Sequence, residues 1–369
     1  MPSLLALCFL ALVCGCRQFH PPPRDMVYVS ERGAIYLHDR VAAVSNRVAE
    51  VSNGEPLQVI ERDGRFLKVK TPKGQIGWIE QSALIDGAMY AQFQKLAADH
   101  LHDPIVAAAS LDVELYMHLA PGRTTQHFYL LPANTKVELL ERASVERTPP
   151  PGSLPAAPLP ANAAPVPGLP QPVAPEMEDW WLARDAKGRT GWLLGTHVDV
   201  IAPDDIAQYA GDQRIVGAYM LTKVSDPDSS FPNHEAPEYL TVMTPYQSGL
   251  PYDFNEVRIF TWSLRHHRYE TAFRLHPING FLPVHTGFEQ TKDGAVPTFS
   301  FEIAGSRNVT VNPATGVTRP VDPRTIRYEM IDTVVKRIGP DMAPIPFLHA
   351  GGKKPRQEAK RAKNRRKRR

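Results

Sequence analysis

Hydrophobic and polar positions alternate over short stretches along most of the chain. Residues 56–60 and 66–70 form two such stretches around the polar Arg62-Asp63-Gly64, and residues 137–140 form a third. A period of two predicts strands with one buried face, and the Gly-containing segment predicts a turn. Residues 88–102 differ, because their apolar positions follow helical spacing and predict one amphipathic helix. These positions are Met89, Phe93, Leu96, Ala97 and Leu101.

The alternating pattern continues beyond residue 203. Leu264–His267 predicts the turn of a hairpin, and residues 328–338 predict a closing hairpin. Helical spacing is an alternative for the last segment, but its Val, Ile and Tyr content and the polar Asp332-Thr333 favour strands. We therefore expect residues 203–340 to form an antiparallel β-sandwich or barrel. Its expected strands are 218–224, 238–243, 256–263, 268–275 and 298–303.

The chain contains an internal repeat. Tyr36-Leu37-His38 recurs as Tyr116-Met117-His118 at an offset of 80, and the segment from Lys73 to Ile79 recurs from Lys187 to Leu193 at an offset of 114. The change of offset indicates an insertion in the second copy, where the Pro/Ala-rich residues 148–176 lie. Such a composition buries too little apolar surface to offset its ordering entropy, so we expect a disordered loop between two strands.

Both copies contain the pattern Lys-Gly-x-x-Gly-Trp, which predicts a tight turn leading into a strand. With Asn53-Gly54 ahead of a strand in the first copy, this pattern resembles the bacterial SH3 (SH3b) domain. The resemblance covers residues 27–87 and 106–202 and implies two small barrels joined by a helical linker, 88–105. The fold class expected for the chain is therefore mainly all-β. The residues that carry the motif are Gly74, Gly77, Trp78, Gly188, Gly191 and Trp192.

The first sixteen residues predict export. Leu4–Val13 is an apolar run of about ten residues, which fits a signal peptide and is too short for a transmembrane helix. The segment from Val13 to Cys16 resembles a bacterial lipobox, which implies a lipid on Cys16 and a tether over residues 17–26. An ordinary signal peptide cleaved near Gly15 is the alternative. The resemblance to enterobacterial lipoproteins implies an outer-membrane protein that faces the periplasm.

Charge is concentrated at one end of the chain. The net charge is +3, yet residues 352–369 hold 11 Lys and Arg against one Glu. We expect residues 341–369 to be a disordered basic tail that is attracted to anionic surfaces such as lipid headgroups or lipopolysaccharide phosphates. Nucleic acid is not the expected partner, because no aromatic residues interleave the charges. A tail that only aids solubility is the alternative.

The sequence predicts no catalytic centre, metal or cofactor. All three cysteines lie within the first sixteen residues, so processing leaves no cysteine nucleophile in the body of the chain. His267 and Glu270, with His276 and His285 downstream, are the best metal candidates. Residues three apart on a strand point to opposite faces, so His267 and Glu270 would share a metal only in a loop.

The first interpretation is a non-enzymatic, lipid-anchored envelope protein of a bacterium whose SH3b modules bind peptidoglycan or an envelope protein. A wall-remodelling hydrolase with its site within residues 205–340 is the first alternative, since SH3b modules often accompany such enzymes. A scaffold without glycan contact is the second.

Overall fold

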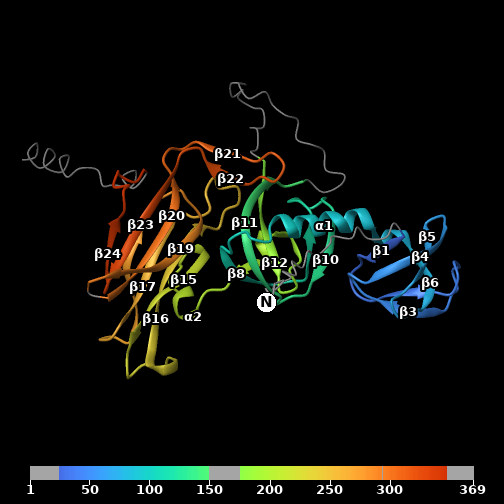
Figure 1. Ribbon diagram of the computed structural model, residues 1–369, viewed down its shortest axis with the longest axis horizontal. Helices are drawn as coiled ribbons and strands as arrows, with labels where there is room; N and C mark the ends of the chain where they lie inside the picture. Colours follow the sequence, from blue (N-terminus) through green and yellow to red (C-terminus); the bar gives the residue numbers. More distant parts are fainter. Residues whose placement is uncertain (1–24, 149–174, 293, 347–369) are drawn as a thin grey trace, which may run out of the picture. The chain divides into compact units, whose positions relative to one another are not determined.

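The computed structural model describes residues 25–148, 175–292 and 294–346 of the chain, and most of these lie in antiparallel β-sheets (Figure 1). Cys16, nearly all of the expected tether, residues 149–174 of the insertion and residues 347–369 of the expected tail lie outside the described residues. Residues 341–346, expected as part of the disordered tail, are described: Asp341 forms an ion pair with Arg324 at 2.7 Å, and Ile345 is buried. The chain forms two compact units, residues 1–91 and 92–369. Within the described ranges no helix is long and apolar enough to cross a membrane.

The first module comprises residues 26–86, drawn in blue in Figure 1, and forms one strongly curved sheet. Its strands pair in the order β3-β2-β6-β5-β4-β1-β7, and every pair is antiparallel. The strands are β1 (Met26–Val29), β2 (Ile35–His38), β3 (Arg47–Val51), β4 (Pro56–Asp63), β5 (Phe66–Lys70), β6 (Ile76–Glu80) and β7 (Leu84–Asp86), with a 3-10 turn η1 (Gln81–Ala83) between the last two.

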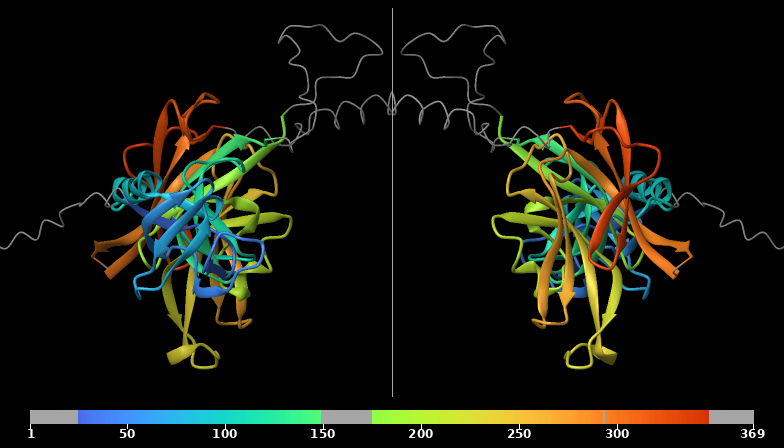
Figure 2. Two further views of the ribbon diagram at one scale, coloured as in Figure 1. Left: turned by 90° about the vertical axis from the view of Figure 1, so that its right-hand side faces the viewer. Right: turned by 90° about the vertical axis from the view of Figure 1, so that its left-hand side faces the viewer.

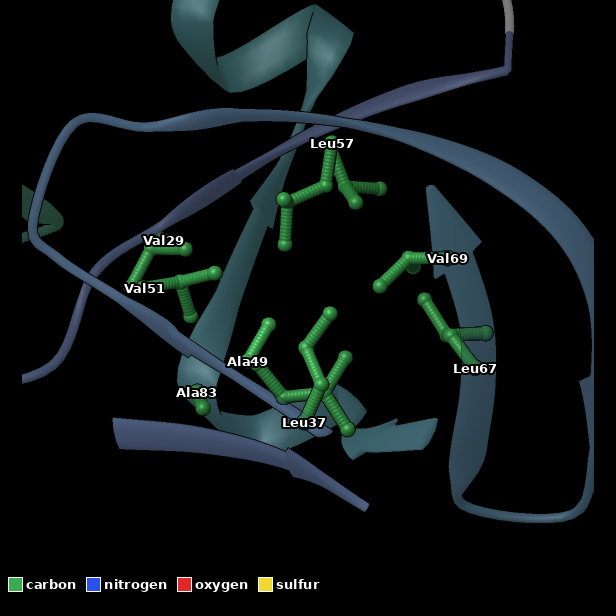
Figure 3. Packing of buried hydrophobic residues seen from close by; sticks show 10 residues of the cluster. Val29, Leu37, Ala49, Val51, Leu57, Leu67, Val69 and Ala83 are labelled. Carbon is green, nitrogen blue, oxygen red and sulfur yellow. The ribbon is translucent and has the colours of Figure 1, made fainter. Parts of the chain in front are cut away.

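Alternation along these strands builds the core of the first module. Leu37, Leu67 and Val69 point inward and are fully buried. Figure 3 shows them with the other aliphatic side chains of the same cluster. Gly77 lies where β2 and β6 approach most closely, because a Cβ placed there would lie 2.7 Å from the Cβ of Leu37. The first glycine of the repeated Gly-Trp turn is different: Gly74 has a φ of +84°, which favours glycine.

The expected helix is α1 (Gly87–Asp99), and it is shorter than its apolar spacing predicts. The Asp86 carboxylate accepts a hydrogen bond from the Met89 amide at 2.8 Å and caps the first turn. After Asp99 the chain tightens into turns, with the Asp103 amide bonded to the His100 carbonyl, and Pro104 follows. Leu101, expected on the apolar face, therefore lies beyond the helix and is exposed.

The second module comprises residues 107–200, and its strand order β10-β9-β13-β12-β11-β8-β14 reproduces that of the first module strand for strand. Its Gly191 meets Met117 as Gly77 meets Leu37, with a Cβ contact of 2.6 Å. The strands are β8 (Ala107–Leu111), β9 (Leu115–His118), β10 (His127–Leu131), β11 (Lys136–Glu146), β12 (Met177–Asp185), β13 (Thr190–Leu194) and β14 (Val198–Val200), with the 3-10 turn η2 (Gly195–His197).

Strands β11 and β12 are paired up to their ends next to residues 149–174, which the structure does not describe. The last partners in the ladder are Glu146 and Met177, and the Arg147 amide donates to the Glu176 carbonyl at 2.7 Å. The two ends of the Pro/Ala-rich segment therefore begin at neighbouring positions of one hairpin.

Residues 213–338 form two four-stranded antiparallel sheets, β15-β16-β17-β18 and β19-β20-β23-β24. Their inner faces meet, for example where the rings of Phe273 and Tyr328 lie 5.2 Å apart, so this region is a β-sandwich. Residues 323–338 are the closing hairpin, with no helix. In Figure 2 the β15–β16 hairpin extends to a tip that carries the 3-10 turn η3 (Pro232–His234). The strands are β15 (Gln213–Ser225), β16 (Glu235–Pro245), β17 (Glu256–Ser263), β18 (Arg268–Leu275), β19 (Gly280–Thr291), β20 (Gly294–Ala304), β23 (Pro323–Ile331) and β24 (Val334–Ile338), besides helix α2 (Asp204–Ala207) and the small hairpin β21 (Val309–Val311) and β22 (Thr318–Pro320).

Candidate functional site

The outer face of β2, β6 and β5 carries a row of aromatic side chains. Because residues two apart on a strand share a face, Tyr36 and His38 both point outward while Leu37 fills the core. His38 pairs with Trp78 of β6, and Trp78 pairs on its other side with Lys68 of β5. Tyr36, His38 and Trp78 are all half-buried, so their rings remain partly accessible.

These rings line a groove of about 780 Å³ in the first module. The segment between β2 and β3 forms one wall of it, and three hydrogen bonds between Asp39 and Asn46 hold the base of this segment. The Asn46 backbone amide and side-chain amide donate to the Asp39 carboxylate at 2.9 and 3.0 Å, and the Asp39 amide donates to the Asn46 carbonyl at 3.0 Å. Hydrogen bonds from Arg40 and Asn46 hold the pKa of Asp39 well below its usual range, so the carboxylate is charged at neutral pH. Ser45, on the same wall, shares a 2.9 Å hydrogen bond with Nδ1 of His38.

Charged groups surround the rings of this groove. The Arg47 guanidinium lies 4.0 Å from the centre of the Tyr36 ring, and the Lys68 ammonium lies 5.6 Å from that of Trp78. Arg65 and Glu80 add an ion pair at 3.6 Å on the groove wall. Flat rings beside both positively and negatively charged side chains suit a ligand that has apolar faces and polar edges.

The equivalent face of the second module is covered. By strand register Phe66, Lys68 and Glu80 correspond to Trp180, Leu182 and Leu194. These apolar side chains pack with Trp192, Ala143 and Val317 in one buried cluster. Val317 comes from the segment between β21 and β22, and it forms a β-bridge with Ala143.

Both modules contain an equivalent hydrogen bond between a histidine and a hydroxyl group. His118 Nδ1 and the Thr125 hydroxyl lie 2.9 Å apart, as His38 and Ser45 do in the first module. Burial, and next the nearby His127, lower the pKa of His118 to about 4. The half-buried His118 of the second module is therefore neutral at neutral pH.

The structure separates the two tryptophans of the Gly-Trp turns. Trp192 is only 2% exposed, whereas Trp78 is half-buried and lines the groove. Gly74 and Gly188 both have positive φ, +84° and +76°, as their turns require. The sequence motif did not single out Tyr36, His38 or Phe66. Tyr36 and His38 recur as Tyr116 and His118, so the repeat itself contains them but does not distinguish the two faces. The distinguishing signal is the exchange of the polar Lys68 and Glu80 for the apolar Leu182 and Leu194 at the equivalent positions.

The histidine motif near residue 267 does not assemble a metal site. His267 Nδ1 contacts the Asp226 carboxylate at 2.9 Å, while Glu270 contacts His266 at 2.8 Å. His276 lies against the Asn255 carbonyl instead. Among the residues that the structure describes, no three His, Cys, Asp or Glu side chains are grouped as metal ligands.

Comparison with known families identifies the first module. Residues 40–85 match the model of the bacterial SH3 domain; the match includes Trp78 of the groove, whereas Tyr36 and His38 lie just before it. The match spans β3 to β7 and includes the Gly77-Trp78 turn. No curated protein matches the chain.

Two solved structures show a distant likeness. NlpC2 from Trichomonas vaginalis is 8% identical, with 80% of this chain and 91% of that chain covered and a TM-score of 0.15. NlpC1 from the same organism is 10% identical, with 68% and 87% covered and a TM-score of 0.15. At that TM-score neither likeness bears on the fold or the activity of this chain.

Proposed function

We propose that this chain is a non-enzymatic cell-envelope protein that binds peptidoglycan in the groove of its first module. The observation that supports this most directly is the aromatic row Tyr36, His38 and Trp78 in an open groove of about 780 Å³. Residues 40–85, which include Trp78 of the groove, match the bacterial SH3 domain, a family that commonly contacts the cell wall. Binding by a few rings and a polar rim is typical of ligand sites in which aromatic side chains supply the area and charges supply orientation.

We propose that the second module is a further SH3-like repeat with a structural role. Its strand order, its glycine contact and its His118–Thr125 hydrogen bond match the first module. Its ring-bearing face is buried against Val317, so it is unavailable to a polymer. We therefore propose that the second module packs against the C-terminal region, whereas the first module binds peptidoglycan.

The groove is tested by sedimentation of the protein with purified, insoluble peptidoglycan at physiological salt. Tyr36→Ala removes a ring that lines the groove, and Tyr246→Ala removes a ring that is 73% exposed elsewhere on the chain. We expect the first variant to lose at least tenfold in affinity and the second to bind like wild type. Equal binding by wild type and Tyr36→Ala would place the contact outside the groove, and retention of wild type in the supernatant would favour a scaffold.

A wall hydrolase remains the alternative, and it requires converging titratable groups in one cleft. His267 and Glu270 are each bonded to a different partner, which disfavours their joint action. The test is the release of soluble fragments from peptidoglycan during prolonged incubation, with and without added Zn²⁺. We expect no release above buffer, and release that depends on His267 would establish the hydrolase.

We further propose that Cys16 carries the lipid of an envelope anchor, with the described modules facing the periplasm. Cys16→Ser is expected to move the exported protein from the membrane fraction to the soluble fraction, because acyl chains contribute about 0.8 kcal/mol per buried methylene. A variant that still pellets with membranes after a salt wash would show that attachment lies elsewhere.

A further inference from the structure

A second cavity, of about 600 Å³, lies at one end of the C-terminal sandwich between its two sheets. Side chains from both sheets line it, including Thr261 of β17 and Met330 of β23. Every residue that lines this cavity falls within 222–333, so none belongs to the first module.

The cavity contains a carboxylic acid on the inner face of a sheet. Along β16 the inward positions are Ala236, Glu238, Leu240 and Val242, all 2% exposed or less. Glu238 therefore occupies a position that the sandwich otherwise fills with apolar side chains. Glu238 is one of the residues that line the cavity, although the residue is only 2% exposed.

The partners of this acid are few. Oε1 of Glu238 accepts a hydrogen bond from the Trp262 amide at 3.2 Å, and among the described residues no Lys, Arg or His pairs with either oxygen. Desolvation by burial raises the pKa of Glu238 to about 7, against the smaller opposing effect of the Trp262 amide. A buried acid that has one neutral donor and no counter-ion is costly for the folded protein, and such groups cluster at functional sites.

We propose that this cavity binds a small ligand through a primary ammonium group, which pairs with the carboxylate of Glu238. An ammonium group supplies both the positive charge and the donors that Glu238 lacks in the protein. The hydroxyls of Thr222, Thr261 and Ser263 offer acceptors around the same cavity, and Met330 offers an apolar wall for the ligand's carbon chain. Amines with a short aliphatic chain, free or as part of a peptide, are the class of ligand that fits.

The probe for this site is n-pentylamine, with n-pentanol as its uncharged match. Binding of each to the folded chain is followed by calorimetry or by ligand-observed NMR at pH 7.5. We expect the amine to bind wild type at least tenfold more tightly than the alcohol. Glu238→Gln keeps the shape of the side chain and removes its charge, so this preference is expected to disappear in the variant.

Two further variants separate this site from the rest of the molecule. Glu302→Gln removes the same charge from an exposed position of β20 and is expected to keep the preference for the amine. Tyr36→Ala, which tests the peptidoglycan groove, is also expected to keep it. A wild type that binds neither probe, or both equally, overturns the proposal, and so does a Glu238→Gln variant that still prefers the amine.

Discussion

Arg142 and Asp253 lie 111 residues apart in the chain, yet Arg142 Nε donates to Asp253 Oδ1 at 2.9 Å, and both side chains are buried. The same guanidinium contacts Asp179 of β12 at 3.1 Å and the carbonyls of Leu250 and Tyr252 at 2.8 and 2.6 Å. Burial alone would lower the pKa of Arg142, but Asp253 and Asp179 outweigh it and raise that pKa. This cluster joins β11 and β12 of the second module to the loop before β17, which explains why both belong to one compact unit.

Loss of this cluster is predicted to destabilise that unit. Asp253→Asn leaves the buried Arg142 with less compensating charge, and removal of one partner from a buried pair typically costs about 3–5 kcal/mol. Urea unfolding followed by far-ultraviolet circular dichroism measures the change. The control is Asp99→Asn, which breaks the exposed Lys95–Asp99 pair at 2.6 Å and should cost below about 1 kcal/mol. Equal effects of the two variants would contradict a structural role for Arg142.

The two tryptophans of the repeated turns are predicted to differ in role. Trp192→Ala removes a ring that is 2% exposed and should cost about 3–5 kcal/mol of unfolding free energy. Trp78→Ala removes a half-buried ring and should cost less stability, but it should weaken peptidoglycan sedimentation at least tenfold. Paired unfolding and sedimentation measurements distinguish the two. A reversal, with Trp192 needed for binding in folded protein, would contradict the proposed division between the modules.

Glu238 predicts a pH dependence of stability with a defined sign. Its pKa is 4.5 in the unfolded reference and about 7 in the fold, so the folded state holds its proton more tightly. The contribution of Glu238 to stability is therefore most favourable below about pH 4.5 and declines as the pH rises to 7, by up to roughly 3 kcal/mol at about 1.4 kcal/mol per pH unit. The other charged groups that line this cavity are Lys223, Arg265, Glu270 and Asp332.

The measurement for Glu238 is a difference, because other acids of the chain titrate in the opposite sense. Asp341, for example, has its pKa lowered to about 2, chiefly by hydrogen bonds from Arg324. Unfolding of wild type and Glu238→Gln is compared from pH 5 to 8. The stability advantage of the variant should grow with pH and level off above pH 7. A constant difference across this range would show that Glu238 stays ionised in the fold.

The mainly β architecture was predictable, because the local alternation of apolar residues agrees with the tertiary packing. Residues 256–263 and 268–275 were predicted as strands with the bounds of β17 and β18. The helix was predicted too long, since Leu101 has the right spacing but follows Asp99, where turns and then Pro104 end the helix. The spacing of apolar residues alone does not indicate where a helix ends.

The candidate site was less predictable, because exposure depends on what covers a strand. The Gly-Trp motif appears twice, and its offset of 114 already aligns the polar Lys68 with the apolar Leu182, as the register of β5 and β12 confirms. The sequence does not show which segment covers the apolar face. Whether Trp78 or Trp192 is accessible then depends on Val317, which lies 125 residues beyond Trp192. The acid in the second cavity had a local signal, since Glu238 shares its strand face with Leu240 and Val242.

The Pro/Ala-rich segment is predicted to be dispensable for folding. Residues 148–175 can be replaced by Asn-Gly, a two-residue turn that matches the paired ends Arg147 and Glu176. Loop closure costs about 0.6 kcal/mol per doubling of length, so the shorter loop should leave the midpoint of thermal unfolding unchanged or raise it. Differential scanning calorimetry measures this. A fall of several degrees would show that the segment stabilises the folded chain.

The basic tail is predicted to carry most of the affinity of this protein for anionic surfaces. Residues 352–369 contribute +10, so their removal changes the net charge from +3 to −7. Binding to vesicles that contain anionic lipid should collapse in the truncated chain, and binding of the intact chain should fall steeply between 50 mM and 500 mM salt, because exposed charges are screened within about 10 Å at 0.1 M.

Two controls show whether charge is what acts in the tail. A tail of the same composition in shuffled order should bind anionic vesicles as wild type does, since no side-chain order is needed for attraction to a charged surface. A tail with Gln in place of each Lys and Arg should bind as weakly as the truncated chain. Binding that survives both truncation and high salt would place the anionic contact in the folded modules, and weak binding by the intact chain at 50 mM salt would leave the tail a role in solubility alone.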